Sequence, residues 1–539
     1  MDRRSFLKAG TGLGGTILAA GGSGRSALAQ PAVSRGAAAG TLRFVPQSNL
    51  ANFDPIWGTQ FVVRNAATMV WDTLYGVDSR IRPQRQMVES EETSADGLTW
   101  TFRLRPGLRF HDGTPVLSRD VVASLNRWAV RDPMGQMIRA IQQELVAVDD
   151  RSFRWVLRKP YPKLLLALGK TNAPIAFIMP ERIAKTDPFQ QIKEYVGSGP
   201  FRFLTDEWVP GAQAHFARFD GYAPREEKPD WLAGGKHALV DRIEWKVMPD
   251  PATAVAALQN NEVDWWENPI TDLVPVLQSN PDLRLDIADP LGNIGVFRMN
   301  HLLPPFDKPE VRRVVLMAID QEDCMRALVG EDHKLWRQVG GYFTPDTTLY
   351  TEAGGEILKG PRNLDAARAA LKASGYDGTP VVMLVAQDQP IVKTQGDVTA
   401  EALRSVGFNV DYVATDWGTT GTRRASKSPV SQGGWNIFFS WFGGADCANP
   451  AGYSGIRANG DGAWFGWPSS PAVEKARDEW FDATDEASAK AAIDRLNAAA
   501  VEDVVFAPTG FFLAYQAWRK NVSGVIQAPM PIFWGVSKA

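Results

Sequence analysis

The chain is poor in the residue types that most often carry catalysis or hold metals. Of its 539 residues, two are cysteine (Cys324 and Cys447) and five are histidine, scattered without the spacing of a metal site. It contains no His-Glu-x-x-His, Cys-x-x-Cys or Gly-x-Ser-x-Gly sequence and no phosphate-binding loop. Two thiols cannot build a disulfide framework, although a single disulfide between Cys324 and Cys447 is an open alternative. We therefore expect no metal, no cofactor and no enzyme active site.

The chain also lacks a basic block and, after its first 29 residues, any long apolar run. It has 58 basic and 61 acidic residues, and residues 30–539 keep 54 and 60, a net charge of −6. Without a basic patch, nucleic acid is not an expected partner. No segment approaches the roughly 18 consecutive apolar residues that a membrane span needs. Tryptophan is abundant instead, and its large rings supply both core and flat walls for ligands.

Residues 1–29 have the pattern of an export signal. Arg3 and Arg4 precede Phe-Leu-Lys, a weakly apolar stretch follows, and Ala27-Leu28-Ala29 is a small-residue cleavage site. The arginine pair resembles twin-arginine signals, with an ordinary secretory signal as the alternative. No cysteine stands at the cleavage site, so we expect no lipid anchor. We expect cleavage near Ala29 and a periplasmic protein.

Residues 40–539 alternate between patterns typical of strands and of helices. Apolar or alternating segments predict strands at 41–49, 98–116, 152–159, 238–248, 292–300, 435–442 and 504–518. Capping residues, such as Ser118, Asp250 and Asn363, predict where the intervening helices start. About 510 residues exceed what one core serves, so we expect at least two α/β lobes with mostly parallel sheets.

Several segments together resemble one family, the extracytoplasmic solute-binding proteins of ABC transporters in the oligopeptide/dipeptide/nickel class (family 5). The segments that carry the resemblance are LRPGLRFHDGTPVLSRDVVASLNRW (104–128), VGSGPFRF (196–203), the stretch 219–264, NIGVFRMNHLLPPFDKPEVRRVVLMAID (293–320) and NLDAARAALKASGY (363–376). Each motif alone is weak, but they occur in the family's order, and the resemblance as a whole covers essentially all of residues 40–539.

The resemblance implies a fold and a function. The fold is two α/β lobes joined by crossing strands, a two-lobed periplasmic binding protein fold with a subdomain inserted in the first lobe. The first lobe would take 40–290 and 505–539, with the subdomain at about 76–190, and the second lobe 291–504. Closure of the lobes around a solute would present it to the membrane permease of an ABC importer. The protein would be a monomer.

The segment SWFGGADCANP (440–450) carries the main site candidates. In peptide-binding members, a tryptophan on this strand is followed by an aspartate that holds the ligand's ammonium. The match falls on Trp441 and Asp446, with two residues more between them than in the family's pattern. A buried ammonium requires such a carboxylate. The alternatives are a core position for Trp441 and an Asx turn for Asp446.

Other candidates follow from positions near the expected cleft. They are Gln47 and Ser48 after the first strand, Trp266 on a returning strand, Asn293 and Gly295 past the crossover, and Phe511 and Phe512 near the second crossover. Arg298 could receive a ligand carboxylate or form a structural ion pair. The main hypothesis is a binding protein for di- or oligopeptides or a related small solute. The alternatives are a metal chelate, an opine or an oligosaccharide, and an extracytoplasmic enzyme or chaperone on the same fold.

Overall fold

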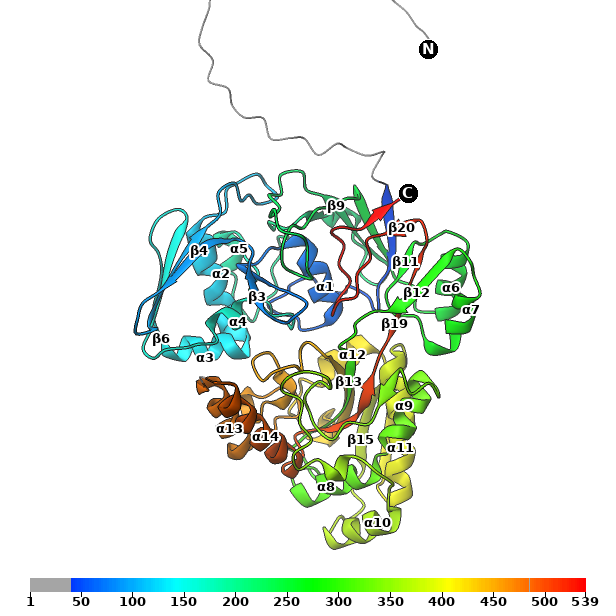
Figure 1. Ribbon diagram of the computed structural model, residues 1–539. Coiled ribbons are helices and arrows are strands. Elements are labelled where there is room, and N and C mark those ends of the chain that lie inside the picture. The colour runs from blue at the N-terminus through cyan, green and yellow to red at the C-terminus, as the bar shows by residue number, and fades with distance from the viewer. Residues whose placement is uncertain (1–39, 484) are drawn as a thin grey trace, which may run out of the picture. The chain divides into compact units, whose positions relative to one another are not determined.

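The described chain begins with a buried strand, β1 (Thr41–Val45), at the middle of a seven-stranded sheet. The computed structural model describes residues 40–483 and 485–539, so the export signal predicted at 1–29 lies outside the described residues. The order across the sheet is β12 (Leu283–Ile287), β19 (Tyr515–Arg519), β11 (Trp265–Trp266), β1, β10 (Arg242–Lys246), β9 (Gln213–Arg218) and β8 (Phe201–Phe203). We call this sheet and the elements around it the first lobe (Figure 1).

Aromatic side chains fill the interior of the first lobe. The ring of Phe44 on β1 lies 5.0–5.4 Å from those of Trp245, Trp265 and Phe533. Trp266 faces the other side of its strand and belongs to a separate, smaller core, because successive side chains alternate across a strand. The helices of this part are α1 (Phe61–Val70), α6 (Pro251–Gln259) and α7 (Val274–Gln278). Asp250 accepts a hydrogen bond from the Thr253 backbone at 2.8 Å, which confirms the predicted start of α6.

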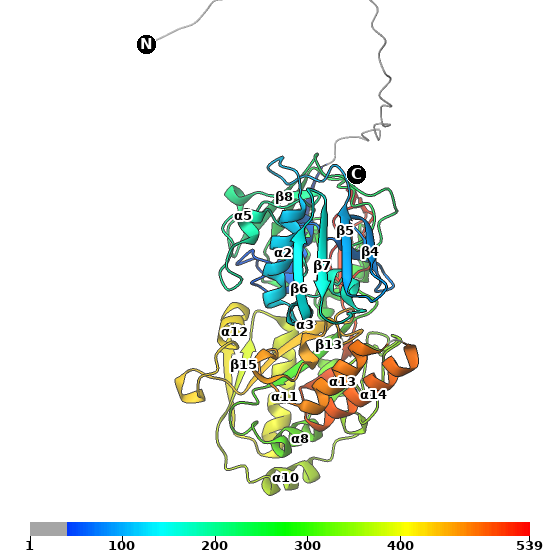
Figure 2. The same ribbon diagram turned by 90° about the vertical axis from the view of Figure 1, so that its left-hand side faces the viewer.

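A four-stranded antiparallel sheet forms a separate layer of the first lobe, within the range expected for the inserted subdomain (Figure 2). Its order is β4 (Val88–Thr93), β5 (Thr99–Leu104), β7 (Ser152–Leu157) and β6 (Gln142–Ala147). Around it are the hairpin β2 (Tyr75–Val77) and β3 (Pro83–Arg85) and the helices α2 (Ser118–Arg131), α3 (Pro133–Ile141), α4 (Leu164–Leu168) and α5 (Glu181–Ala184). The predicted cap of α2 was wrong by one residue: Leu117 is the cap, and its backbone N–H donates to Asp120 at 2.8 Å.

A six-stranded sheet organises the second lobe. Its order is β14 (Trp336–Arg337), β18 (Ala507–Phe512), β13 (Asn293–Met299), β17 (Ile437–Gly443), β15 (Val381–Ala386) and β16 (Val410–Thr415). The helices around it are α8 (Pro309–Ala318), α9 (Gln321–Val329), α10 (Leu364–Ala373), α11 (Pro390–Val406), α12 (Trp417–Arg423), α13 (Pro471–Asp482) and α14 (Glu486–Glu502). Asn363 caps α10 through the backbone of Ala366, as predicted.

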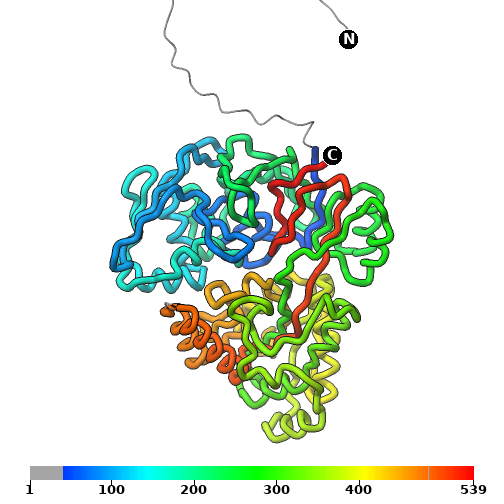
Figure 3. The backbone as a smooth tube through the Cα atoms, in the orientation of Figure 1, coloured from blue at the N-terminus to red at the C-terminus, as the bar shows by residue number. Residues whose placement is uncertain are grey.

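Two chain segments cross between the sheets. One joins β12 to β13 and the other joins β18 to β19, and the tube in Figure 3 shows both passing between the lobes. The backbone N–H of Ala288 donates to the carbonyl of Ala514 at 2.8 Å, which holds the two crossings side by side. The single strand predicted at 504–518 is therefore two strands, and the chain returns to the first lobe only after Phe512, not at 505.

The prediction of mostly parallel sheets was wrong. Parallel pairing is confined to β1 with its two neighbours and to β15 with its two neighbours. The remaining neighbours are antiparallel because hairpins and the two crossing segments supply them. A strand β20 (Val522–Ser523) pairs with β21 (Ser537–Lys538) near the end of the chain.

The described part of the chain offers no metal centre and no disulfide. Cys324 and Cys447 are both buried and free. Across residues 40–483 and 485–539, three or more His, Cys, Asp or Glu side chains nowhere gather closely enough to hold a metal ion. Nor does any helix of these residues combine the length and apolar character needed to cross a membrane.

Candidate functional site

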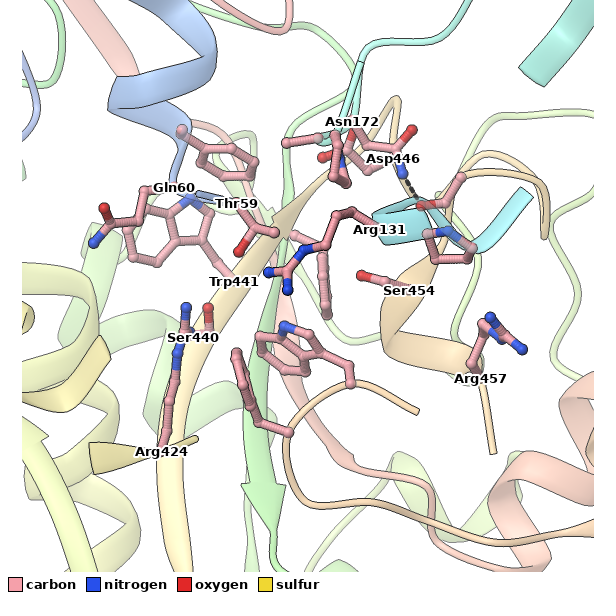
Figure 4. A pocket seen from close by; sticks show the side chains of 18 of the residues that line it. Thr59, Gln60, Arg131, Asn172, Arg424, Ser440, Trp441, Asp446, Ser454 and Arg457 are labelled. Carbon is pink, nitrogen blue, oxygen red and sulfur yellow. Dashed lines mark hydrogen bonds between the residues drawn. The ribbon is translucent and has the colours of Figure 1, made fainter. Parts of the chain in front are cut away.

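A cavity of about 330 Å³ lies between the two lobes (Figure 4). The first lobe lines it with Gln47, Ser48, Thr59, Gln60, Phe61, Val62, Arg131, Pro133, Asn172, Ala173 and Pro174. The second lobe contributes Trp417, Arg424, Ser440, Trp441, Phe442, Asp446, Gly452, Ser454, Arg457, Asp461, Gly462, Ala463, Trp464, Phe465 and Trp467. The volume is near the lower end of the range of about 300–1,000 Å³ for small-molecule sites. The cavity therefore suits a small solute rather than a long chain.

Trp441 forms an aromatic wall that draws on both lobes. It lies on β17, where its ring stacks on that of Trp417 at 5.8 Å and 25°. Phe61, from the start of α1 in the first lobe, meets the same ring edge-on at 5.9 Å and 63°. Such aromatic pairs add about 0.5–1.5 kcal/mol of stabilisation to the free energy gained by burying their surface. The wall is thus complete only when the lobes are together.

Asp446 lies in the turn that follows β17 and is 4% exposed. The hydroxyl of Thr171, from the first lobe, donates to its Oδ1 at 3.1 Å. The guanidinium of Arg64, also from the first lobe, lies 3.9 Å from Oδ2. Burial raises the pKa of Asp446, and the charge of Arg64 opposes that rise. The carboxylate is therefore held where the lobes meet.

The alternative of an Asx turn at Asp446 does not match the structure. No backbone amide of the described residues donates to its carboxylate; the side chain of Asn449 accepts from Ala451 at 2.9 Å and makes the local turn instead. The Asp446 side chain is consequently available to the cavity that it lines.

Arg64 lies within a group of buried carboxylates beside the crossings. Burial lowers the pKa of Arg64, and the negative charges of Asp446, Glu267 and Asp289 raise it by a smaller amount. Glu267 accepts from the Gln47 backbone at 2.7 Å and from the Asn65 side chain at 2.9 Å. Burial raises the pKa of both Glu267 and Asp289 to about 7. The charge of Arg64 is therefore shared among several carboxylates rather than committed to Asp446.

Four of the predicted site residues come together at the main cavity, and a fifth lies next to it. Gln47, Ser48, Trp441 and Asp446 line the main cavity. Asn293 lines a smaller cavity of about 80 Å³ that shares Gln47, Phe61 and Trp441 with the first. The two cavities therefore adjoin at these three side chains.

Arg298 has neither of the roles predicted for it. It is fully buried, and its guanidinium donates to the backbone carbonyls of Phe465 at 2.7 Å, Val505 at 3.0 Å, Gly455 at 3.1 Å and Trp464 at 3.2 Å. No described carboxylate pairs with it, and it does not line the cavity. Burial lowers its pKa to about 9. Arg298 therefore ties loops of the second lobe to β13.

The other predicted residues lie away from the main cavity lining. A Cβ at Gly295 would come within 2.1 Å of the Thr509 hydroxyl, so glycine is needed there for close strand contact. Arg337 covers the ring of Phe511 at 4.8 Å, and Phe512 is buried in the core. Trp266 lies in the smaller core of the first lobe. These aromatic side chains serve packing.

The sequence patterns do not mark three arginines of the cavity, Arg131, Arg424 and Arg457. Each lies in a polar stretch without a motif, so no local signal distinguishes it. Thr171 and Asn172 were also missed; Asn172 donates across the lobes to the carbonyl of Gly452. Pairing between residues so far apart in sequence is visible only in the folded chain.

A cavity between two α/β lobes that are joined by two crossing segments is typical of solute-binding proteins. Residues 82–464 match the model described as bacterial extracellular solute-binding proteins, family 5 (middle), and the chain belongs to this family. It is accordingly a solute-binding protein of this family, as the sequence resemblance implied.

Two curated relatives illustrate the range of the family. The chain is 34% identical over 552 residues, covering 100% of both chains, to a Sinorhizobium fredii protein named "Probable peptide ABC transporter periplasmic-binding protein y4tO". It is 24% identical over 403 residues, covering 73% of each chain, to the glutathione-binding protein GsiB of Escherichia coli.

Solved structures share the fold. The binding protein AgaA of A. tumefaciens R10, in complex with agropinic acid, matches with a TM-score of 0.79 at 20% identity over 93% of this chain and 99% of that one. DppA of Helicobacter pylori, in complex with the peptide STSA, matches with a TM-score of 0.79 at 19% identity over 93% and 98%. The two-lobed α/β fold predicted from the sequence is confirmed.

Proposed function

We propose that the protein captures a short peptide, or a related amino-bearing solute, between its lobes and delivers it to the permease of an ABC importer. The observation that carries this proposal is the position of Asp446 and Trp441 on the wall of one inter-lobe cavity. The full-length likeness to a protein named as a peptide transporter component supports the ligand class.

Asp446 is suited to hold the solute's ammonium. Its carboxylate is buried, and one oxygen has a hydroxyl partner at 3.1 Å while the other has Arg64 at 3.9 Å, beyond hydrogen-bond length. A buried carboxylate without a bonded cation is stabilised by an ammonium that completes its pairing. Trp441 then provides a flat apolar surface beside that anchor.

Lobe closure couples binding to transport. The contacts of Asp446 with Thr171, and of Trp441 with Phe61, join residues of different lobes. A solute that bridges the same surfaces favours the closed form only by as much as it binds that form better. The permease would then bind the closed, solute-loaded form.

Thermal shifts with a panel of di-, tri- and tetrapeptides test this function. By mass action, a bound peptide adds about 2.7 kcal/mol to the unfolding free energy at one hundred times its dissociation constant, and so raises the unfolding midpoint. Mass spectrometry of solute released from periplasmic protein identifies the natural ligand. No shift with any peptide, together with a recovered solute that lacks an amine, would reject the peptide function.

A second candidate is the same transport role with a non-peptide acidic solute, such as an opine. The three arginines of the cavity favour it, and a structural neighbour holds agropinic acid. A metal chelate is held by another structural neighbour, NikZ of Campylobacter jejuni in complex with Ni(L-His), but the charges of this cavity do not single it out. No observation favours an oligosaccharide.

We further propose an exported monomer that binds without turnover. Residues 1–29 would direct export through the twin-arginine route, with cleavage near Ala29. Replacing Arg3 and Arg4 by lysine should stop export, and the N-terminal sequence of the periplasmic protein should begin near Gln30.

Two measurements test the other parts of this proposal. Peptide incubated with the protein should be recovered intact, and light scattering should give the mass of one chain.

A further inference from the structure

Arg424 is a buried cation without an acidic partner among the described residues. It follows α12, is 6% exposed and lines the main cavity. Its guanidinium carbon lies 4.8 Å from the ring centre of Phe465, 5.5 Å from Trp464 and 5.7 Å from Trp417. Its Nε has no hydrogen-bond partner in the described part of the chain. Aromatic faces attract the charge but supply no hydrogen-bond acceptor in the plane of the guanidinium.

Arg457 is a second under-partnered cation of the same cavity. It is 7% exposed, and neither its Nε nor its Nη1 has a described partner. The nearest carboxylate, Glu474, is 4.0 Å from its Nη2. Glu474 already accepts from Arg477 at 2.8 Å and from the Ala458 backbone at 2.7 Å. The positive charge at Arg457 is therefore largely unmatched.

The acidic residues that line the cavity, Asp446 and Asp461, form no ion pair with Arg424 or Arg457. Asp446 lies beside Arg64, and Asp461 at the rim pairs with Lys427. Arg131, the third arginine, is half-buried; it donates to the Trp57 carbonyl at 3.2 Å and covers the ring of Phe189. Figure 4 shows Arg131, Arg424 and Arg457 spread around the cavity rather than paired with one another. The lining consequently carries an excess of positive charge.

Two buried guanidinium groups with no described carboxylate at hydrogen-bond distance are costly unless something else neutralises them. Guanidinium matches carboxylate in geometry and binds it through parallel hydrogen bonds. We propose that the cavity selects an acidic solute with at least two carboxylates, one received by Arg424 and one by Arg457. This inference rests on the proposed function only in taking this cavity as the place where the transported solute binds. The inference goes further by specifying that the solute is acidic, which the Asp446 anchor alone does not determine.

A graded series of dipeptides tests the inference by calorimetry on the ligand-free mature protein. Ala-Glu, Ala-Gln and Ala-Gln amide carry two, one and no carboxylates at nearly constant size. Affinity should rise about tenfold or more with each carboxylate, because each forms charge-assisted hydrogen bonds in a buried site. The difference between Ala-Glu and Ala-Gln measures the contribution of the side-chain carboxylate. The difference between Ala-Gln and Ala-Gln amide measures that of the α-carboxylate. Equal affinity across the series would overturn the inference.

Substitutions assign each carboxylate to its arginine. Arg424→Met should remove one step of the series and Arg457→Met the other, each by about tenfold. Arg404→Met is the matched control, because Arg404 is exposed on α11 and does not line the cavity. A merely structural arginine would behave differently: its loss would lower the unfolding midpoint of ligand-free protein and weaken all three probes equally. That pattern would overturn the assignment.

Glutarate and glutaramide separate this inference from the peptide function. If no dipeptide binds the wild-type protein, the peptide function fails while the charge inference is still tested. Glutarate, with two carboxylates and no amine, should then raise the unfolding midpoint of wild-type protein at constant ionic strength. It should raise that of Arg424→Met by less, because only Arg457 is left to receive a carboxylate. Glutaramide should have no effect on either. A wild-type protein that is indifferent to both the dipeptides and glutarate would refute the acidic site.

Discussion

Asp446→Asn changes a single charge at the proposed ammonium anchor and almost nothing else. The amide oxygen of asparagine can still accept from the Thr171 hydroxyl, which lies 3.1 Å from Oδ1. The side chain keeps its size in a site that is 4% exposed. The substitution therefore separates the role of the charge from that of packing and of the hydrogen bond across the lobes.

The magnitude follows from burial and from the position of Arg64. Removing one partner of a buried, hydrogen-bonded charge pair costs about 2–5 kcal/mol of binding free energy. Arg64 stands 3.9 Å from the carboxylate and would then repel the solute's ammonium without compensation. We expect the affinity for an amino-bearing solute to fall by at least about 30-fold, since about 1.4 kcal/mol is a factor of ten.

The stability of the ligand-free protein should not fall in parallel. Burial already raises the pKa of Asp446, and its charge also raises the pKa of Asp289. Replacing it by a neutral group removes that repulsion. The unfolding midpoint should therefore stay the same or rise slightly, which shows that any loss of affinity is not a loss of fold.

Titration calorimetry with the best-binding peptide of the panel, or with the recovered natural solute, measures the effect. Asp461→Asn is the matched control, because Asp461 lines the same cavity but is exposed and paired with Lys427. Exposed ion pairs contribute about 0–1 kcal/mol, so the control should lose less than about fivefold. Equal affinities of wild type and Asp446→Asn would refute the anchor role.

Three further predictions concern Trp441, Arg298 and Asp289. Trp441→Ala should weaken binding by about tenfold, since it removes the stack on Trp417 and the edge contact with Phe61; Trp441→Phe should recover most of the loss in calorimetry. Arg298→Met should remove the guanidinium donor from four backbone carbonyls, of which that of Trp464 still accepts from the Trp467 backbone, and lower the unfolding free energy by about 3 kcal/mol or more in urea titration; a stability close to wild type would contradict its structural role. Asp289 has a folded-state pKa of about 7, above its ordinary 3.8, so the folded protein holds a proton that the unfolded chain releases. Its contribution to the unfolding free energy therefore falls as pH rises from about 4 to about 7. Asp289→Asn should flatten this fall in thermal scans, and an unchanged slope would exclude Asp289 as its source.

Local patterns predicted the helices well where a cap marked the start. Asp250 and Asn363 do cap α6 and α10, because a short polar side chain reaches a backbone N–H only three residues away. Ser118 was one residue off, since the carboxylate of Asp120 satisfies the backbone of Leu117 instead. The Ser118 hydroxyl donates to the carbonyl of Asp149 and does not cap the helix.

The predictions failed where one run of residues serves two distant partners. The apolar segment 504–518 reads as one strand, yet β18 pairs with β13 and β19 pairs with β11 and β12. Nothing in the apolar pattern marks the change of sheet, because both strands are buried. The same limit applies to Arg298, whose partners are backbone carbonyls that carry no sequence signal.

Residue patterns were enough to predict most helices and strands, their order and the family, because periodicity, caps and ordered motifs act over a few residues at a time. They also marked Trp441 and Asp446. Which charges are matched became visible only in the folded chain. Asp446 meets Thr171 across 275 positions of sequence, whereas Arg424 meets aromatic rings and no described carboxylate. Pairing depends on distance in space and on burial, which no local pattern records, and so the charge of the solute emerges only from the fold.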